Sequence, residues 1–242
     1  MNRNIDAIFL DTGNTMRTVS QDPSFQYAAR KEIVKLLGSK DSPDVFCARL
    51  EERYRTYKKW TKENQVQAPE NELWTRWMLP DFPAEKITPL IGKLSRLWID
   101  QGGRWVIRPD VKSTVIELSK RGYILGIIAN STFETEIPDW LEEHDIRQYF
   151  KALALSAKLG IRKPNPEIFL EAARLAGSAP SRCAYVGDNP VRDIQGARSA
   201  GYQMVVILLE SDTLKKEPPK VKALPDAIIY KFHELLDIFP HR

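Results

Sequence analysis

The sequence predicts an α/β protein with a parallel sheet and a helical insert. Residues 5–10 form a short apolar run that ends on Asp11, which is typical of a buried parallel strand. Residues 17–103 carry the spacing of helices, and from about residue 104 strand-like and helix-like segments alternate to the C-terminus. We therefore expect a Rossmann-like three-layer core of residues 1–16 and 104–242, divided after its first strand by a helical domain of residues 17–103.

Length and composition favour a soluble globular protein. The chain has 242 residues, of which 43% are hydrophobic, and no apolar stretch approaches the ~20 residues that span a membrane. The N-terminus lacks the pattern of a secretion signal, so we expect a cytoplasmic protein. The two cysteines, Cys47 and Cys183, are far apart in the sequence and form no metal-ligand pair, which fits a reducing compartment.

The insert is expected to contain helices at 24–37, from about 42 through Trp60, at 70–78 and at 84–99. Its aromatic side chains interleave with lysines and arginines. The favoured interpretation is a small bundle with an aromatic core and a solvated basic face, with a face that attracts an anionic substrate as an alternative. A nucleic-acid surface is not favoured, because the formal net charge of the whole chain is only +4.

The core is expected to continue in regular alternation after the insert. The expected helices are 109–121, 138–145, 166–175, 190–200 and a closing helix through residue 236, and the expected strands are 123–128, 152–155, 183–186, 204–208 and 226–229.

Polar residues at strand ends and in one loop are the candidates for chemistry. Asp11 and Asp188 each end an apolar strand, and ligands gather at the carboxyl ends of strands in an open α/β sheet. Pro190 can open the next helix and so place Asp193 near its first turn, facing the same loop. Such an oxygen-rich pocket suits Mg²⁺, which accepts one or two carboxylates with waters and phosphate oxygens.

Two segments resemble motifs of the haloacid dehalogenase-like hydrolases. Residues 160–169 are similar to the lysine motif of that family, and residues 187–193 to its acidic motif. The likeness extends over the whole chain, with residues 17 to about 103 corresponding to the helical cap of the phosphatase-like branch. It implies a hydrolase that acts on a small phosphorylated substrate. The charge and hydropathy of the chain favour neither a nucleic-acid nor a membrane partner.

The resemblance also implies a role for each site residue. Asp11 would attack the substrate phosphorus, and water would later hydrolyse the aspartyl-phosphate. Mg²⁺ would bind Asp11, Asp188 and the backbone carbonyl of Gly13, and with the ammonium of Lys163 it would screen the approach of two anions. Asp193 would hold the waters of the metal or Lys163 in place.

Two positions depart from the family pattern. Phosphatases of this family usually have a second Asp two residues after the nucleophile as general acid and base, and here that residue is Gly13. General acid-base assistance is typically worth about 10²- to 10⁴-fold, so Gly13 predicts a slow phosphatase or a preference for good leaving groups. The usual Ser or Thr of the second motif is Ala129, which leaves the phosphoryl oxygens to backbone amides, Asn130 or Ser131.

These departures keep two alternatives open beside a Mg²⁺-dependent phosphatase. A dehalogenase of the same family also lacks the second Asp and needs no metal, but Asp188 argues against it, because like charges repel in a metal-free site. A binding or regulatory protein that has lost turnover would explain both substitutions.

Overall fold

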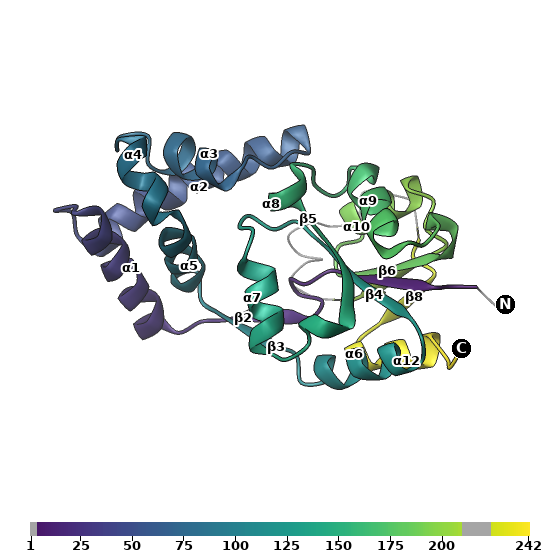
Figure 1. The fold of residues 1–242 in the computed structure, drawn as a ribbon. Coiled ribbons are helices and arrows are strands. Elements are labelled where there is room, and N and C mark those ends of the chain that lie inside the picture. The colour runs from purple at the N-terminus through teal and green to yellow at the C-terminus, as the bar shows by residue number, and fades with distance from the viewer. Residues whose placement is uncertain (1–3, 210–223) are drawn as a thin grey trace. The chain divides into compact units, whose positions relative to one another are not determined.

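The computed structural model describes residues 4–209 and 224–242. The core expected from the sequence, residues 1–16 and 104–242, also includes residues 1–3 and 210–223, which lie outside the described residues. The core is a six-stranded sheet in the order β5-β4-β1-β6-β7-β8, with every neighbouring pair parallel (Figure 1). The predicted α/β class is therefore confirmed. The strands are β1 (Ala7–Leu10), β4 (Ile124–Ala129), β5 (Phe150–Leu155), β6 (Cys183–Gly187), β7 (Met204–Leu208) and β8 (Ala227–Ile229).

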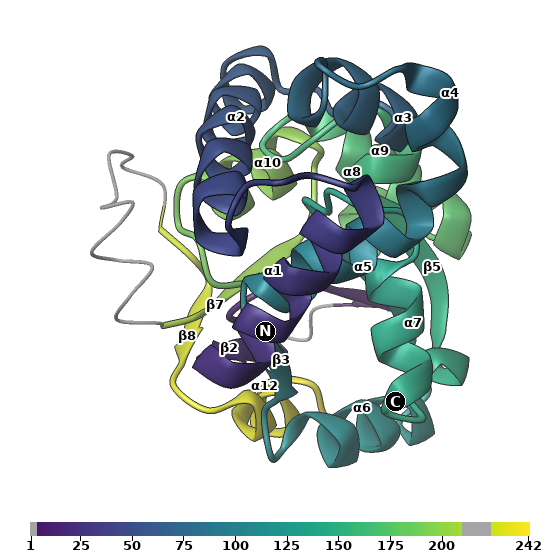
Figure 2. The same ribbon diagram turned by 90° about the vertical axis from the view of Figure 1, so that its left-hand side faces the viewer.

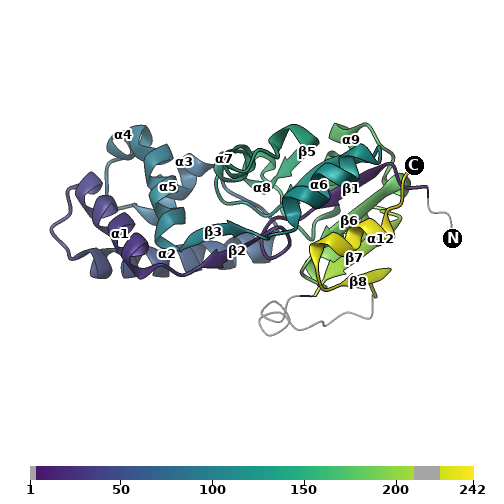
Figure 3. The same cartoon turned by 90° about the horizontal axis from the view of Figure 1, so that it is seen from below.

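Helices cover both faces of the sheet and make three layers. On one face α9 (Pro166–Ala176) and α10 (Arg192–Ser199) bury Phe169 and Ile194 against Phe9 of β1. On the other face α6 (Val111–Lys120) and α12 (Leu235–Ile238) lie in front of the strands when the molecule is seen from below (Figure 3). Among the described residues, the remaining helices of the core are α7 (Glu136–Glu143), α8 (Ser156–Leu159) and 3₁₀ turns at Arg147–Tyr149, Pro180–Arg182 and Phe232–Glu234.

Helix α9 shows how local sequence sets the boundaries of these elements. The side chain of Asn165 accepts a hydrogen bond from the Glu167 N–H at 3.0 Å, Pro166 fills the first helical position, and Gly177 ends the helix in the left-handed conformation. Gly196 of α10 permits close packing on α9, because a Cβ there would lie 2.3 Å from the ring of Phe169. The helix carrying the acidic motif is thus held tightly to the core.

Contacts divide the chain into two compact units, Val19–Val106 and the core of Met1–Thr18 with Ile107–Arg242. Within the first of these, α1 and α5 pack side by side (Figure 2). Asp22 and Ser42 cap α1 and α2 with their side chains, each followed by a proline. The helices of this unit are α1 (Pro23–Leu37), α2 (Pro43–Asn64), α3 (Glu70–Glu72), a π-helix (Leu73–Met78), α4 (Ala84–Ile87), a 3₁₀ turn (Thr88–Leu90) and α5 (Ile91–Gln101).

Aromatic side chains form much of the interior of this helical unit. Tyr57 and Trp74 are fully buried, and the rings of Trp60 and Trp77 lie 5.1 Å apart. Trp74 Nε1 donates to Ser95 Oγ at 2.8 Å, which satisfies its polar group. The packing agrees with the bundle interpretation of the aromatic pattern. None of the helices in the described parts of the chain is long and apolar enough to cross a membrane.

Two short strands lie where the sequence analysis placed the start of the insert and the return to the core. β2 (Arg17–Ser20) and β3 (Arg104–Ile107) pair in a separate two-stranded sheet. Four residues are too few to show a period, and the β-branched residues Thr18, Val19 and Val106 favour extended backbone. The expected helix at 70–78 also differs, since residues 73–78 adopt π-helical hydrogen bonding.

Candidate active site

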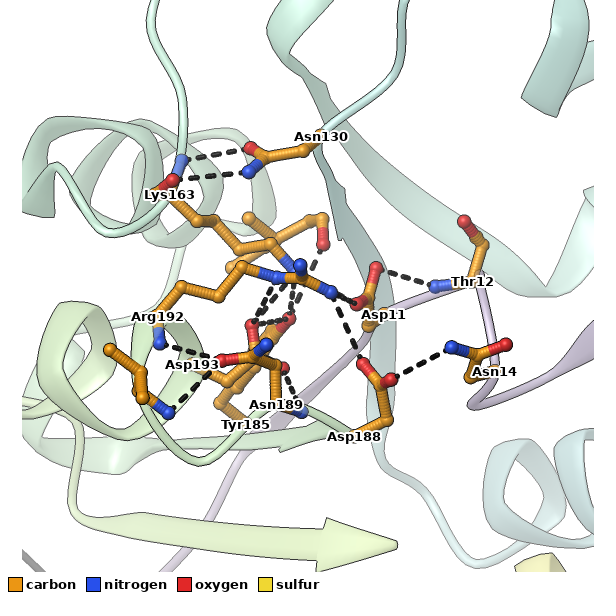
Figure 4. Close-up of polar contacts among 12 residues, drawn as sticks. Asp11, Thr12, Asn14, Asn130, Lys163, Tyr185, Asp188, Asn189, Arg192 and Asp193 are labelled. Carbon is orange, nitrogen blue, oxygen red and sulfur yellow. Dashed lines mark hydrogen bonds and ion pairs between the residues drawn. The ribbon is translucent and has the colours of Figure 1, made fainter. Parts of the chain in front are cut away.

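The carboxyl ends of three adjacent strands bring the predicted polar residues together. Asp11 follows β1, and its N–H donates to the Val186 carbonyl of β6 at 2.8 Å. Asp188 follows β6, and Asn130 follows β4 on the other side of β1. One carboxylate oxygen from each of Asp11, Asp188 and Asp193 lies within 4.8 Å of the others, and all three residues are buried (Figure 4).

The turn after β1 orients two of these carboxylates. The Thr12 N–H donates to Asp11 Oδ1 at 2.8 Å, and the Thr12 carbonyl accepts from the N–H groups of Met16 and Arg17. Asn14 adopts a left-handed conformation with φ 56°, which Asn tolerates better than most residues. Its Nδ2 donates to Asp188 Oδ2 at 3.1 Å. Asn14 was absent from the predicted site, although an Asn in a tight turn beside a nucleophile is a usable signal.

Gly13 lies in this turn with free space around its Cα. A Cβ built there meets no heavy atom within 4 Å, and its φ lies outside the left-handed range. Gly13 and Arg17 form an isolated β-bridge. In this bridge the Arg17 N–H donates to the Thr12 carbonyl and the Asn14 N–H donates to the Arg17 carbonyl, so the bridge does not use the Gly13 carbonyl. The backbone at this position therefore accepts a larger residue.

Lys163 lies between two carboxylates with its side chain fully buried. Its Nζ is 3.0 Å from Asp11 Oδ2 and 3.0 Å from Asp193 Oδ1, and it donates to the Tyr185 hydroxyl at 2.5 Å. The Tyr185 hydroxyl also donates to Asp193 Oδ1 at 3.2 Å. Burial, followed by the nearby carboxylates, raises the pKa of Tyr185 well above its ordinary value, so the phenol stays neutral. A buried ammonium needs such partners to offset its lost hydration.

Asn130 holds the main chain of Lys163 at both ends. Its Oδ1 accepts from the Lys163 N–H at 2.8 Å, and its Nδ2 donates to the Lys163 carbonyl at 3.0 Å. Ser131 Oγ accepts from the Ala157 N–H at 3.3 Å at the start of α8. In the structure, the amide of Asn130 therefore positions the loop that carries Lys163. The sequence had pointed instead to phosphoryl oxygens as a partner of Asn130.

Asp193 is fully buried in the first turn of α10. Its Oδ2 accepts from the Asn189 N–H at 3.0 Å. A Cβ at Gly187 would lie 2.2 Å from that same oxygen, so only glycine fits before Asp188. Burial opposes ionisation of Asp193, but Lys163, Arg192 and the Asn189 amide outweigh it and lower its pKa. The carboxylate is therefore charged at neutral pH.

Arg192 completes the cluster from the same turn of α10. Its Nη2 is 3.3 Å from Asp188 Oδ1 and 3.7 Å from Asp11 Oδ2, and its Nε is 3.7 Å from Asp193 Oδ1. Arg192 was not among the predicted site residues, although it stands four residues after Asp188, a spacing at which side chains meet in a helical turn.

The family of the chain follows from comparison with known proteins. The family model for haloacid dehalogenase-like hydrolases matches residues 5–201. The chain belongs to this family. A glyceraldehyde 3-phosphate phosphatase of Methanopyrus kandleri is 35% identical over 133 residues, which are 54% of this chain and 55% of the relative. A phosphoserine phosphatase of Thermus thermophilus is 29% identical over 59% of this chain and 55% of the relative.

The matched region spans about half the length of these curated relatives. Solved structures of the family match the whole fold. A 2-haloacid dehalogenase from Pseudomonas syringae superposes with a TM-score of 0.69 over 97% of both chains at 24% identity. A HAD phosphatase from Thermococcus onnurineus superposes with a TM-score of 0.60 over 98% of this chain and 99% of that chain at 21% identity. At such identities these structures establish the fold of this hydrolase family member.

The donors in this haloacid dehalogenase-like hydrolase fit a hard divalent cation. The carboxylates of Asp11 and Asp188 are buried, adjacent and made of the oxygen ligands that Mg²⁺ accepts. Three carboxylates and the two cations Lys163 and Arg192 leave the cluster with a formal charge of −1. A buried net negative charge favours binding of a cation.

Proposed function

We propose that this protein is a Mg²⁺-dependent phosphatase that uses Asp11 as a nucleophile on a small phosphorylated metabolite. The observation that carries the proposal is the buried carboxylate of Asp11, held between Lys163 and the neighbouring Asp188 at the carboxyl ends of β1 and β6. The phosphatase names of the relatives from M. kandleri and T. thermophilus support the same reaction.

The reaction would proceed in two displacements. A carboxylate oxygen of Asp11 forms a bond to phosphorus, the ester P–O bond breaks, and the leaving oxygen takes the electron pair and then a proton from solvent water, because Gly13 offers no acid. Water then forms a bond to the same phosphorus and gives up a proton to solvent, the bond to Asp11 breaks with return of its electron pair to the carboxylate, and phosphate is released. Lys163 neutralises the approach of the dianion, and Asp193 with Tyr185 fixes the ammonium in place. When bound to Asp11, Asp188 and the Gly13 carbonyl, Mg²⁺ would supply further positive charge to the phosphoryl oxygens.

The loop after β4 would supply a donor to the substrate, and the helical insert would be a separate cap. We assign residues 17–103 to a helical cap, which corresponds closely to the compact unit Val19–Val106. The Ser131 oxygen accepts from the Ala157 amide, so its hydroxyl hydrogen can be directed to a phosphoryl oxygen. This donor would take the part of the hydroxyl that Ala129 lacks.

A substrate panel measured with and without Mg²⁺ tests this function. We expect phosphate release from small phosphomonoesters in Mg²⁺, and none after the metal is chelated. Asp188→Ala should abolish the effect of Mg²⁺, because it removes one proposed ligand. Halide release from 2-haloacids without metal would instead identify a dehalogenase. Ligand binding without turnover on any ester would identify a binding protein.

Gly13→Asp should restore the missing general acid. We expect turnover of alkyl phosphates to rise by about 10- to 100-fold, and that of nitrophenyl phosphate to change little, because an alkoxide needs a proton as its bond breaks. The free space at Gly13 and its φ allow the change without strain. Steady-state kinetics on both esters measures the effect.

Gly13→Asn is the matched control for this substitution. Asn has nearly the same shape as Asp but cannot donate and take back a proton, so it should leave both rates unchanged. Equal rates for Gly13→Asp, Gly13→Asn and the parent on every ester would show that the absent acid is not the limiting defect. The missing hydroxyl at Ala129, or a loss of enzymatic function, would then explain the low activity.

A further inference from the structure

We propose that Arg192 is an internal competitor for the divalent cation, and that its guanidinium must leave the carboxylates of Asp11 and Asp188 before the ion binds there. This inference rests on the proposed function, because it concerns the same metal site. It makes Arg192 a positioning residue that sets how readily the protein takes up its metal.

The contacts of Arg192 carry the inference. Its Nη2 bridges Asp188 Oδ1 at 3.3 Å and Asp11 Oδ2 at 3.7 Å (Figure 4). These are oxygens of the two carboxylates that would coordinate Mg²⁺. An ion bound to both would lie within contact range of the guanidinium, and like charges at such separations repel strongly in a buried site. The arginine and the ion are therefore alternative occupants.

The exposure of Arg192 gives it a route out of the site. Its side chain is 30% exposed, whereas the side chains of Lys163, Asp188 and Asp193 are 0% exposed. Lys163 is fixed by Tyr185 and by the two bonds of Asn130 to its main chain. Of the two cations in the cluster, Arg192 is thus the one that can swing into solvent.

The carboxylates can remain in place after Arg192 departs. Asn14 Nδ2 holds Asp188 Oδ2 at 3.1 Å, and the Thr12 N–H holds Asp11 Oδ1 at 2.8 Å. Departure of the guanidinium changes the formal charge of the cluster from −1 to −2. The vacated site is then preformed and more negative, which is what a divalent cation requires.

Calorimetric titration with Mg²⁺ of the wild type and Arg192→Gln tests the competition. The neutral side chain should tighten Mg²⁺ binding by about tenfold, which is the gain expected when a competent state of about one tenth occupancy becomes dominant. In chelator, the same variant should unfold at a lower temperature than the wild type, because the three carboxylates lose a partner. If Arg192 had only a structural role, Arg192→Gln would instead weaken Mg²⁺ binding and lower the unfolding temperature.

Arg198→Gln is the matched control. Arg198 lies on the same helix and pairs with Asp226 at 2.5 Å, away from the carboxylate cluster. It should lower the unfolding temperature and leave Mg²⁺ affinity unchanged. Arg192→Lys, which keeps a charge on a shorter side chain without the guanidinium fork, should bind Mg²⁺ with an affinity between those of the wild type and Arg192→Gln.

Mg²⁺ binding by Arg192→Gln that is equal to or weaker than that of the wild type would overturn the inference. It would leave the proposed function standing, because metal-dependent phosphate release by the wild type does not depend on this outcome. If the Gln variant does not fold, an affinity of Arg192→Lys no tighter than that of the wild type would overturn it. Absence of Mg²⁺ binding in the wild type and every variant would overturn both this inference and the metal in the proposed function.

Discussion

Asp11→Asn is expected to lower kcat for phosphate ester hydrolysis by at least about 10⁴-fold, a loss typical of removing a nucleophile. The amide cannot form the aspartyl-phosphate. Its carbonyl oxygen can still accept the bond that the Thr12 N–H now gives to Asp11 Oδ1. The shape of the site should therefore be retained while the covalent step is lost.

Rapid quenching with radiolabelled substrate provides the measurement. The wild type should carry a phosphoryl label that hydroxylamine removes, and Asp11→Asn should carry none. Asp44→Asn is a matched control, since Asp44 lies on α2 and pairs on the surface with Arg30 at 3.2 Å. Wild-type turnover by Asp11→Asn would exclude Asp11 as the nucleophile.

Lys163→Met is expected to reduce both activity and stability. Kcat should fall by at least about 10³-fold through loss of the cation that screens the phosphate. The free energy of unfolding should fall by about 3–5 kcal/mol, since removing one partner leaves buried carboxylates without compensation. The affected carboxylates are Asp11 and Asp193, each 3.0 Å from Nζ in the wild type.

The pH dependence of this loss distinguishes charge from packing. The pKa of Asp193 is lowered in the folded wild type, so its stabilisation is present above the unfolded-state pKa of about 3.9 and disappears as pH falls through the folded-state value. Denaturant unfolding should show the largest defect of Lys163→Met at neutral pH and a smaller one below about pH 4. A defect of equal size at both would indicate lost packing alone.

Lys151→Met serves as the control for the lysine substitution. Lys151 is an exposed residue of β5 whose Nζ donates to the Ala176 carbonyl at 2.8 Å. We expect it to change the free energy of unfolding by less than about 1 kcal/mol and to leave kcat unchanged. A stability loss as large as that of Lys163→Met would show that removal of any lysine stem produces the effect.

The sequence allowed the prediction of the sheet and of the acidic residues, because both follow from local rules. A buried strand that ends on Asp11 or Asp188 identifies itself by composition, and parallel strands bring their ends to one edge. The contacts of Tyr185 were not predictable in the same way. Tyr185 is part of an apolar strand and reads as core, and its hydroxyl acquires a role only when Lys163, distant in sequence, packs over it.

The short strands β2 and β3 were missed for a related reason. Each has four residues, and each is defined by pairing with the other across more than 80 positions of sequence. No periodicity can accumulate in so short a segment. The role of Asn130 was likewise invisible, since the sequence shows an amide near a motif but not that its partner is the main chain of Lys163.

The two hydrogen bonds between Asn130 and the main chain of Lys163 link the loop after β4 to the loop that carries Lys163, so the position of one loop depends on the other. For protein engineering, the segment after β4 and the lysine loop are then not interchangeable parts. A graft that restores a hydroxyl at Ala129 but replaces Asn130 would release the backbone that aims the ammonium at Asp11. Segments exchanged between members of this family should therefore be transplanted as a pair.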